Sequence, residues 1–157
     1  MTDLHGRVAL VTGASRGLGA AIAARLASQG AQVVLTARTV GGLEATDDAV
    51  RAAGGADAVI APADLADPLA VASLVAAVYE RFRRLDFVVS AAAFTSPLTP
   101  IAHQRPEDWV TSIAVNLTAP FQLMRNAEPL LRQSGGAALF ITCKEGQVPR
   151  PYYGAYA

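Results

Sequence analysis

The sequence has little of the chemistry that would make it a metal-binding or disulfide-stabilised protein. Among its 157 residues, only Cys143 is a cysteine. A single cysteine cannot form an intrachain disulfide, and it excludes a cysteine-rich zinc site. The two histidines, His5 and His103, lie far apart in the sequence, and we expect both at the surface. We therefore predict no metal site.

An excess of charge of either sign is also missing. Lysine and arginine total 13, aspartate and glutamate total 13, and the formal net charge is zero. No global field would attract nucleic acid or an anionic membrane. No apolar run approaches the ~20 residues of a membrane span, and the N-terminus lacks the basic and apolar regions of a signal peptide. The sequence predicts a soluble, cytoplasmic protein with no nucleic-acid or membrane partner.

The sequence does have a regular alternation of two kinds of segment. Hydrophobic residues make up 52% of the chain, and the length suits a single domain over residues 1–157. Short apolar runs predict strands at residues 8–12, 33–36, 58–61, 87–90 and 138–142. Alanine-rich segments with helical spacing predict helices at residues 18–28, 43–53, 68–82, 106–115 and 119–132.

This alternation predicts the fold class. Strands that are apolar throughout are buried on both faces, which requires helices on each side of a parallel sheet. We therefore predict an α/β fold: a doubly wound, Rossmann-like parallel sheet in three layers, α/β/α. Its ligand is expected at the carboxyl ends of the strands, near the point where the strand order reverses. Asp47 and Asp48 are expected on a solvated helix face.

A glycine-rich loop directly follows the first predicted strand and leads into a helix. It contains Gly13, Ser15, Arg16, Gly17, Leu18 and Gly19. Glycines here allow a tight turn, a close approach of the backbone to a pyrophosphate, and close packing of helix on strand, while the helix N-terminus supplies free N–H groups. Small-residue turns between strands and helices are common, but the order strand, glycine loop, helix, strand favours a dinucleotide site.

The end of the second strand indicates which dinucleotide is preferred. NAD-binding folds place an acid near this point to accept hydrogen bonds from the adenosine ribose, but Ala37 and Arg38 stand here instead. Arg38, with Arg16 from the glycine loop, could hold a 2′-phosphate. The alternative is that both arginines are merely solvated. We predict that NADP(H) is the preferred cofactor, with NAD(H) as the alternative. Asp64 and Leu65, after the third strand, are predicted to reach the adenine edge.

Four motifs in order resemble the short-chain dehydrogenase/reductase family, over essentially the whole chain. They are the loop at residues 12–19, Asp64-Leu65, Val115-Asn116, and the segment from Ile141 to Gly146 followed by Gly154-Ala155-Tyr156-Ala157. The resemblance implies that Tyr156 is the general acid/base, that Asn116 supports a proton relay, and that Cys143 stands at the position of the family's serine. It also implies a small-molecule carbonyl or alcohol substrate and a homo-oligomer.

The sequence departs from the family pattern at several positions. Residues 90–93 read Ser-Ala-Ala-Ala where the family has Asn-Asn-Ala-Gly, but small side chains still leave room for the cofactor beside Ala92. Cys143 offers only a weak thiol donor, or is simply a small buried residue. The family's lysine four residues after Tyr156 has no counterpart, because the sequence ends at Ala157.

These departures lead to an expectation about the chain and to two functional hypotheses. We expect the sequence to be the N-terminal part of a longer protein, or a product cut at Tyr156, so that the sheet is truncated after the fifth strand and residues 138–142 form an exposed apolar edge. The first hypothesis is an NADP(H)-dependent oxidoreductase that reduces a carbonyl or oxidises a secondary alcohol by hydride transfer. The second is a non-catalytic NADP(H)-binding module that acts as a sensor, scaffold or partner subunit. The segment from Phe94 to Pro100 is expected to border the substrate pocket.

Overall fold

A single parallel sheet forms the centre of the computed structural model, which describes residues 3–148 and 150–157. The strands lie in the order β3-β2-β1-β4-β5. They are β1 (Val8–Thr12), β2 (Gln32–Thr36), β3 (Val59–Ile60), β4 (Phe87–Ser90) and β5 (Ala137–Phe140). After β3 the chain crosses back over β1 to form β4, so the strand order reverses between β1 and β4. The predicted α/β doubly wound fold is confirmed.

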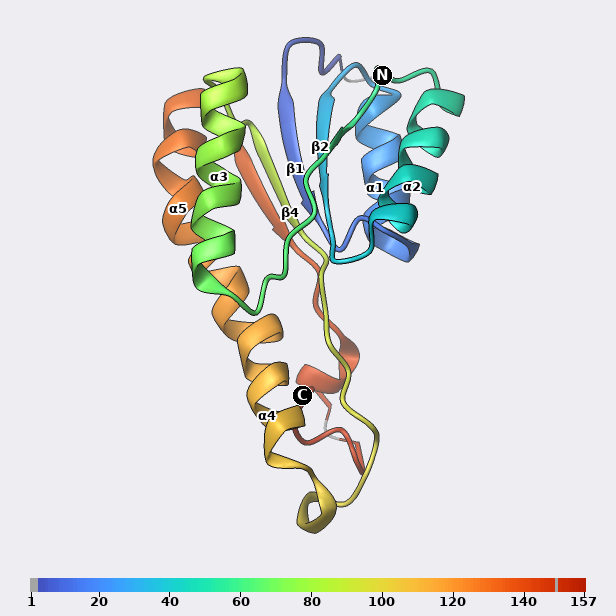
Figure 1. Cartoon of the computed structure of the whole chain (residues 1–157), viewed down its shortest axis with the longest axis vertical. Coiled ribbons are helices and arrows are strands. Elements are labelled where there is room, and N and C mark those ends of the chain that lie inside the picture. Colours follow the sequence, from blue (N-terminus) through green and yellow to red (C-terminus); the bar gives the residue numbers. More distant parts are fainter. Residues whose placement is uncertain (1–2, 149) are drawn as a thin grey trace.

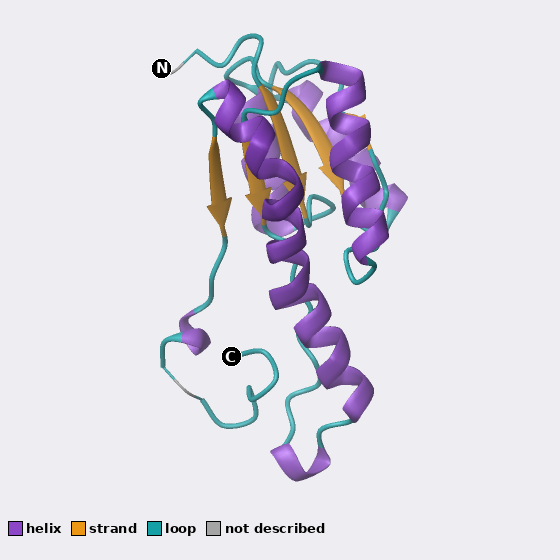
Figure 2. Cartoon of the chain, turned by 90° about the vertical axis from the view of Figure 1, so that its left-hand side faces the viewer, coloured by secondary structure: helices purple, strands orange, loops and turns teal. Residues whose placement is uncertain are grey.

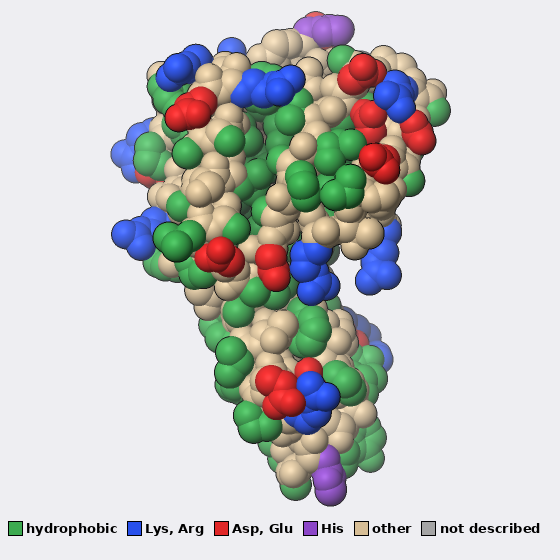
Figure 3. Space-filling view, viewed as in Figure 1, with side chains coloured by type: hydrophobic (Ala, Val, Ile, Leu, Met, Phe, Trp, Pro, Cys, Tyr) green, Lys and Arg blue, Asp and Glu red, His purple; other side chains and the backbone are tan. Residues whose placement is uncertain are grey.

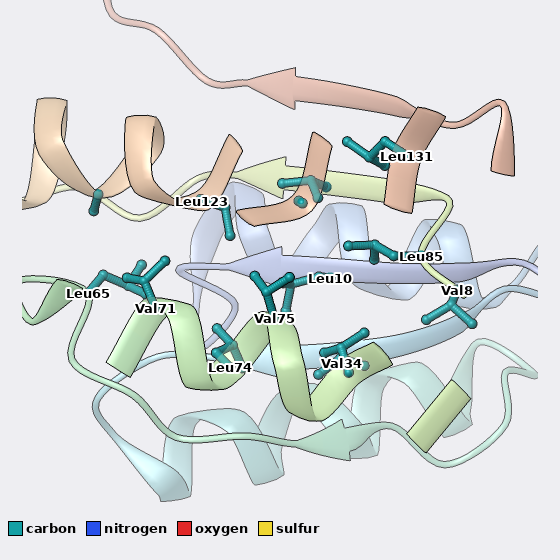
Figure 4. Packing of buried hydrophobic residues seen from close by; sticks show 14 residues of the cluster. Val8, Leu10, Val34, Leu65, Val71, Leu74, Val75, Leu85, Leu123 and Leu131 are labelled. Atoms are coloured by element: carbon teal, nitrogen blue, oxygen red, sulfur yellow. The ribbon is translucent and has the colours of Figure 1, made fainter. Parts of the chain in front are cut away.

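Helices cover both faces of this sheet (Figure 1). The helices α1 (Gly17–Ala27) and α2 (Val40–Ala52) pack on one face, and α3 (Pro68–Phe82) and α5 (Ala119–Ser134) pack on the other. Successive strand residues point to opposite faces. Leu10 and Val34 therefore join Val75 and Leu123 in one apolar cluster (Figure 4), whereas Val11 joins the cluster under α1 and α2.

Local chemistry fixes the ends of α3 where the sequence predicts them. Asp67 accepts a hydrogen bond of 2.9 Å from the Leu69 N–H, and Pro68 occupies the first turn, where its missing N–H is not needed. Arg83 ends the helix in the left-handed conformation, at φ 54°. The N-terminus of α1 differs, because Arg16 at its N-cap makes no side-chain hydrogen bond to the first turn. The start of α1 is thus left open toward the carboxyl ends of the strands.

The two helices predicted at 106–115 and 119–132 are in fact continuous. Helix α4 (Pro106–Ile113) passes through a π turn, η2 (Ala114–Thr118), into α5 without a break. Short turns η1 (Ile101–His103) and η3 (Lys144–Gly146) lie with α4 in the narrow part of the molecule, beyond the sheet (Figures 1 and 2). Both predicted stretches are helical, and the residues left unassigned between them form a widened π turn that joins the two helices.

Other predictions need smaller corrections. Strand β3 has two residues rather than four, and β5 begins one residue earlier and ends two residues earlier than predicted. All four residues of β5 are exposed, as expected for an edge strand, and Figure 2 shows it at the outer side of the sheet. Asp47 is not solvated: it is buried, accepts a 2.6 Å hydrogen bond from the Ala58 N–H, and pairs with Arg51. Within residues 3–148 and 150–157, no helix is both long and apolar enough to cross a membrane.

Candidate functional site

A cavity of about 700 Å³ lies at the carboxyl ends of the strands. The register of the sheet brings the ends of four strands level there, because Thr12 pairs with Thr36 and Ser90, and Ser90 pairs with Phe140. The cavity collects all ten residues that the sequence proposes for the cofactor, namely Gly13, Ser15, Arg16, Gly17, Leu18, Gly19, Arg38, Asp64, Leu65 and Ala92. The structure therefore brings these residues together, while their roles remain predictions.

Two glycines make the floor of the cavity possible. Gly13 has φ +63°, and a Cβ there would lie 2.6 Å from the Ala92 nitrogen. A Cβ on Gly19 would collide with the carbonyl oxygen of Gly13. Any larger residue would push the loop away from the strands or fill the cradle above the open start of α1. Free N–H groups of a helix N-terminus facing a cavity of this size suit the phosphates of a dinucleotide.

Thr12 holds the far wall of this cradle, and the sequence did not single it out as a site residue. Its Oγ1 accepts hydrogen bonds from the Ala91 N–H at 3.1 Å and the Ala92 N–H at 3.3 Å, and donates to the Val89 carbonyl at 3.3 Å. One hydroxyl thus braces a segment that has no amide side chains of its own. Its place at the end of β1, level with Ser90, is the signal that could have identified it.

The rim at the end of β2 carries positive charge. Arg16 and Arg38 are exposed and line the cavity, and neither makes an ion pair with another residue of the described chain. Asp64 is the one carboxylate among the lining residues, and its Oδ1 accepts a 3.0 Å hydrogen bond from the Ala66 N–H within a local turn. Figure 3 shows basic side chains projecting from the underside of the sheet-containing part, beside the open space.

Asn116 lies in the π turn and holds the loop that follows β4. Its Oδ1 accepts a 2.8 Å hydrogen bond from the Phe94 N–H, and its Nδ2 donates at 2.7 Å to the Phe94 carbonyl. Nδ2 also donates to the Ser112 hydroxyl at 3.0 Å, and Ser112 in turn donates to the Ala155 carbonyl at 2.7 Å. Asn116 does not itself line the cavity; it fixes backbone that does.

Tyr156 enters the same cavity from the C-terminal segment. Burial raises the pKa of its phenol, and the neighbouring side chains of Cys143 and Glu145 raise it further, while the Thr95 hydroxyl lowers it. The structure therefore brings Tyr156 and Cys143 together, as the resemblance implies. Cys143 is half-buried, rather than the small buried residue of the alternative interpretation. Phe94 and Thr95, from the segment expected to border the pocket, also line the cavity.

The family model for short chain dehydrogenases matches residues 7–157. The chain belongs to the short-chain dehydrogenase family. This chain is 40% identical to a metagenomic short-chain oxidoreductase solved in complex with NADP, with a TM-score of 0.92 over 98% of this chain and 69% of that one. It is 32% identical to the 3-oxoacyl-(acyl-carrier-protein) reductase of Agrobacterium tumefaciens solved with NADP bound, with a TM-score of 0.89 over 98% and 59% of the two chains.

Curated members of the short-chain dehydrogenase family are similarly related. The chain is 35% identical over 159 residues to the 3-oxoacyl-(acyl-carrier-protein) reductase of Synechocystis, covering 100% of this chain and 64% of that protein. It is 35% identical over 158 residues to an uncharacterised oxidoreductase of Mycobacterium tuberculosis, covering 99% and 59%. The chain thus spans about three-fifths of the length of these relatives, from 59% to 64%.

Proposed function

We propose that this chain carries the cofactor site and part of the catalytic site of an NADP(H)-dependent oxidoreductase that reduces a carbonyl or oxidises a secondary alcohol of a small molecule. The observation that carries the proposal is the cavity at the reversal of strand order. Its floor is an uncapped helix start above Gly13 and Gly19, where no Cβ fits, and its rim carries Arg16 and Arg38. A diphosphate on the floor and a 2′-phosphate on the rim would match this distribution of donors.

The preference for NADP(H) over NAD(H) rests on the end of β2. The residues there are Ala37, Arg38 and Thr39. No carboxylate at this position accepts hydrogen bonds from the ribose hydroxyls, and none repels a phosphate. Arg38 can form two parallel hydrogen bonds with a phosphate, and Arg16 faces the same space. The two similar structures solved with NADP support the same preference.

A protonated Tyr156 suits the proton-donating step of carbonyl reduction. When bound, the nicotinamide would supply or accept a hydride. Because the pKa of Tyr156 is raised above its ordinary value of 10.0, the phenol keeps its proton at neutral pH. A protonated phenol lining the cavity can donate that proton to a substrate oxygen as negative charge develops there. The half-buried thiol of Cys143 next to it is the weaker donor of the two.

A second function is favoured by the charges around Tyr156. Two neighbouring side chains, the thiol of Cys143 and the carboxylate of Glu145, raise the pKa of its phenol, and Lys144 is exposed. An NADP(H)-binding module without catalysis, acting as a sensor, scaffold or partner subunit, would tolerate this arrangement. Turnover of NADPH with a panel of aldehydes and ketones by the longest natural form of the protein separates the two functions, because the module binds NADPH without oxidising it.

Calorimetric titration of this chain with NADPH and NADH tests the proposal. We expect NADPH to bind more tightly, and Arg38→Ala to weaken NADPH binding by roughly tenfold, about 1.4 kcal/mol, while leaving NADH nearly unchanged. Arg25→Ala is the matched control, because Arg25 is exposed in the last turn of α1, away from the cavity. Equal affinities for the two dinucleotides in the unmutated chain contradict the NADP(H) preference. Absence of heat with both contradicts the proposed function itself.

A further inference from the structure

The Ser112 hydroxyl makes a connection that the sequence did not suggest. Ser112 lies on α4 and is fully buried. Its Oγ donates a 2.7 Å hydrogen bond to the carbonyl of Ala155, 43 residues further along the chain, and accepts a 3.0 Å hydrogen bond from Asn116. This buried hydroxyl therefore both donates and accepts a hydrogen bond, and these bonds offset the cost of removing it from water.

The neighbouring hydroxyl shows that this is not an ordinary helical bond. Thr111 donates at 2.8 Å to the carbonyl of Glu107, four residues earlier in the same helix. That local bond is the usual outcome for a hydroxyl residue within a helix. Ser112 instead connects two segments that are distant in sequence. It bonds directly to Ala155 and, through Asn116 one turn further on, to Phe94, whose N–H and carbonyl Asn116 holds at 2.8 and 2.7 Å.

The two anchored residues directly precede two residues of the cavity wall. Phe94 is followed by Thr95 and Ala155 by Tyr156, and both Thr95 and Tyr156 line the cavity. We propose that Ser112 is a positioning residue: through Asn116 and the Ala155 carbonyl it sets the Tyr156 phenol opposite the Thr95 hydroxyl. The role assigned to Tyr156 rests on the proposed function, but the coupling between Ser112, Thr95 and Tyr156 does not.

The chemistry at Tyr156 gives this positioning a purpose. The groups that act on its phenol are the Cys143 thiol, the Glu145 carboxylate and the Thr95 hydroxyl. Glu145 is itself paired with Arg150 at 3.4 Å. Among the three, the Thr95 hydroxyl alone lowers the pKa of Tyr156, because an O–H donor stabilises the phenolate, whereas the side chains of Cys143 and Glu145 raise that pKa. A phenol held away from Thr95 would lose this one favourable contact.

A double-mutant cycle on the pKa of Tyr156 tests the coupling. The tyrosines are replaced biosynthetically with a fluorinated tyrosine that ionises at lower pH, and each phenol is titrated by fluorine NMR. The signal that is missing from the spectrum of the Tyr156→Phe variant is assigned to Tyr156. Thr95→Val removes the donor, and we expect it to raise the pKa of Tyr156 by about half a unit to one unit. In a Ser112→Ala background, we expect the same Thr95→Val change to shift that pKa by less than half as much.

Controls keep each outcome decisive. Thr111→Ala removes a hydroxyl from the adjacent residue, and we expect the Thr95→Val shift to be unchanged in that background. If S112A does not fold by circular dichroism, S112C replaces it, because the thiol keeps the volume and weakens the donor. An equal Thr95→Val shift with and without the Ser112 hydroxyl overturns the proposal.

NADPH calorimetry on the same variants tests the proposed function separately. A chain that shows the coupling but binds no NADPH contradicts the proposed function and supports the positioning role. A chain that binds NADPH but lacks the coupling supports the proposed function and contradicts the positioning role.

Discussion

Strands β1 and β5 have similar apolar sequences and opposite environments. All five residues of β1 are buried, whereas all four residues of β5 are exposed. The central strand has β2 and β4 as neighbours and helices over both faces, while β5 pairs, among the described residues, with β4 alone. Apolar composition indicates a strand of a parallel sheet, but the number of neighbours decides how much of it is buried.

The two ends of the cavity also differ, in whether the residues that build them are close together along the chain. The cofactor end is made mostly of backbone within one short loop, where Gly13 and Gly19 leave the space. The end around Tyr156 is made of side-chain hydrogen bonds that run through Ser112 and Asn116. A site built from neighbouring residues can be recognised in sequence, whereas a site built from distant partners requires the fold.

The comparison of the two strands predicts the largest difference in stability. Leu10→Ala removes a side chain of 0% exposure from the centre of β1, and we expect a loss of about 3–4 kcal/mol in the free energy of unfolding. Leu139→Ala truncates a side chain of β5 that is 49% exposed, and we expect a loss below about 1 kcal/mol. Urea denaturation followed by circular dichroism measures both. An equal loss for Leu139 would mean that β5 is covered in solution.

A buried carboxylate, Asp86, stabilises the amino-terminal ends of β1 and β4, opposite the cavity. Asp86 accepts hydrogen bonds from Arg7 at 2.7 Å, from Arg84 at 2.6 Å and from the Val8 N–H at 2.9 Å. We expect Asp86→Asn to lower the free energy of unfolding by about 3 kcal/mol, because both arginines lose their charged partner. Asp48→Asn is the control: its carboxylate is exposed, and we expect less than about 0.5 kcal/mol.

The pH dependence of stability sharpens the Asp86 prediction. Burial by itself would raise the pKa of Asp86, but its hydrogen bonds with the two arginines and Val8 outweigh burial and lower that pKa below 3.8. A lowered pKa in the folded state contributes stability above the unfolded value, and that stability is lost as pH falls through the folded value. The difference between the unmutated chain and Asp86→Asn is therefore expected to persist at pH 7 and to shrink below about pH 4. A difference that stays constant down to pH 2 contradicts this.

Replacement of two glycines in the first turns of helices is expected to have the smallest effect on stability. The pair distinguishes the need for space in the cradle from the effect of glycine on a helix. In Gly19→Ala the new Cβ meets the Gly13 carbonyl, so we expect a loss of about 1–3 kcal/mol together with loss of NADPH binding. In Gly41→Ala, on α2, no atom lies within 4 Å of the new Cβ, and we expect a gain of up to about 1 kcal/mol with NADPH binding retained. Thermal unfolding and calorimetry measure both. Retained binding in Gly19→Ala would contradict the cradle.

Several features were predictable because their causes are local. The start of α3 at Pro68 follows from the Asp67 cap, and the end of α5 follows from Gly135, which has φ +65°. Asp47 was predicted wrongly because its partner, the Ala58 N–H, approaches only when β3 packs beside α2. The continuity of α4 and α5 was missed because a π turn has no distinctive residue pattern.

The sequence by itself determined the order of strands and helices, the glycine cradle and the family, because each is written in residues close together along the chain. Only the tertiary structure decided that one buried hydroxyl on α4 joins the segments before Thr95 and Tyr156, and that Asp47 is buried against the Ala58 N–H. Hydrogen bonds between distant segments and the burial of a side chain depend on which surfaces meet, and periodicity along the chain carries no record of that.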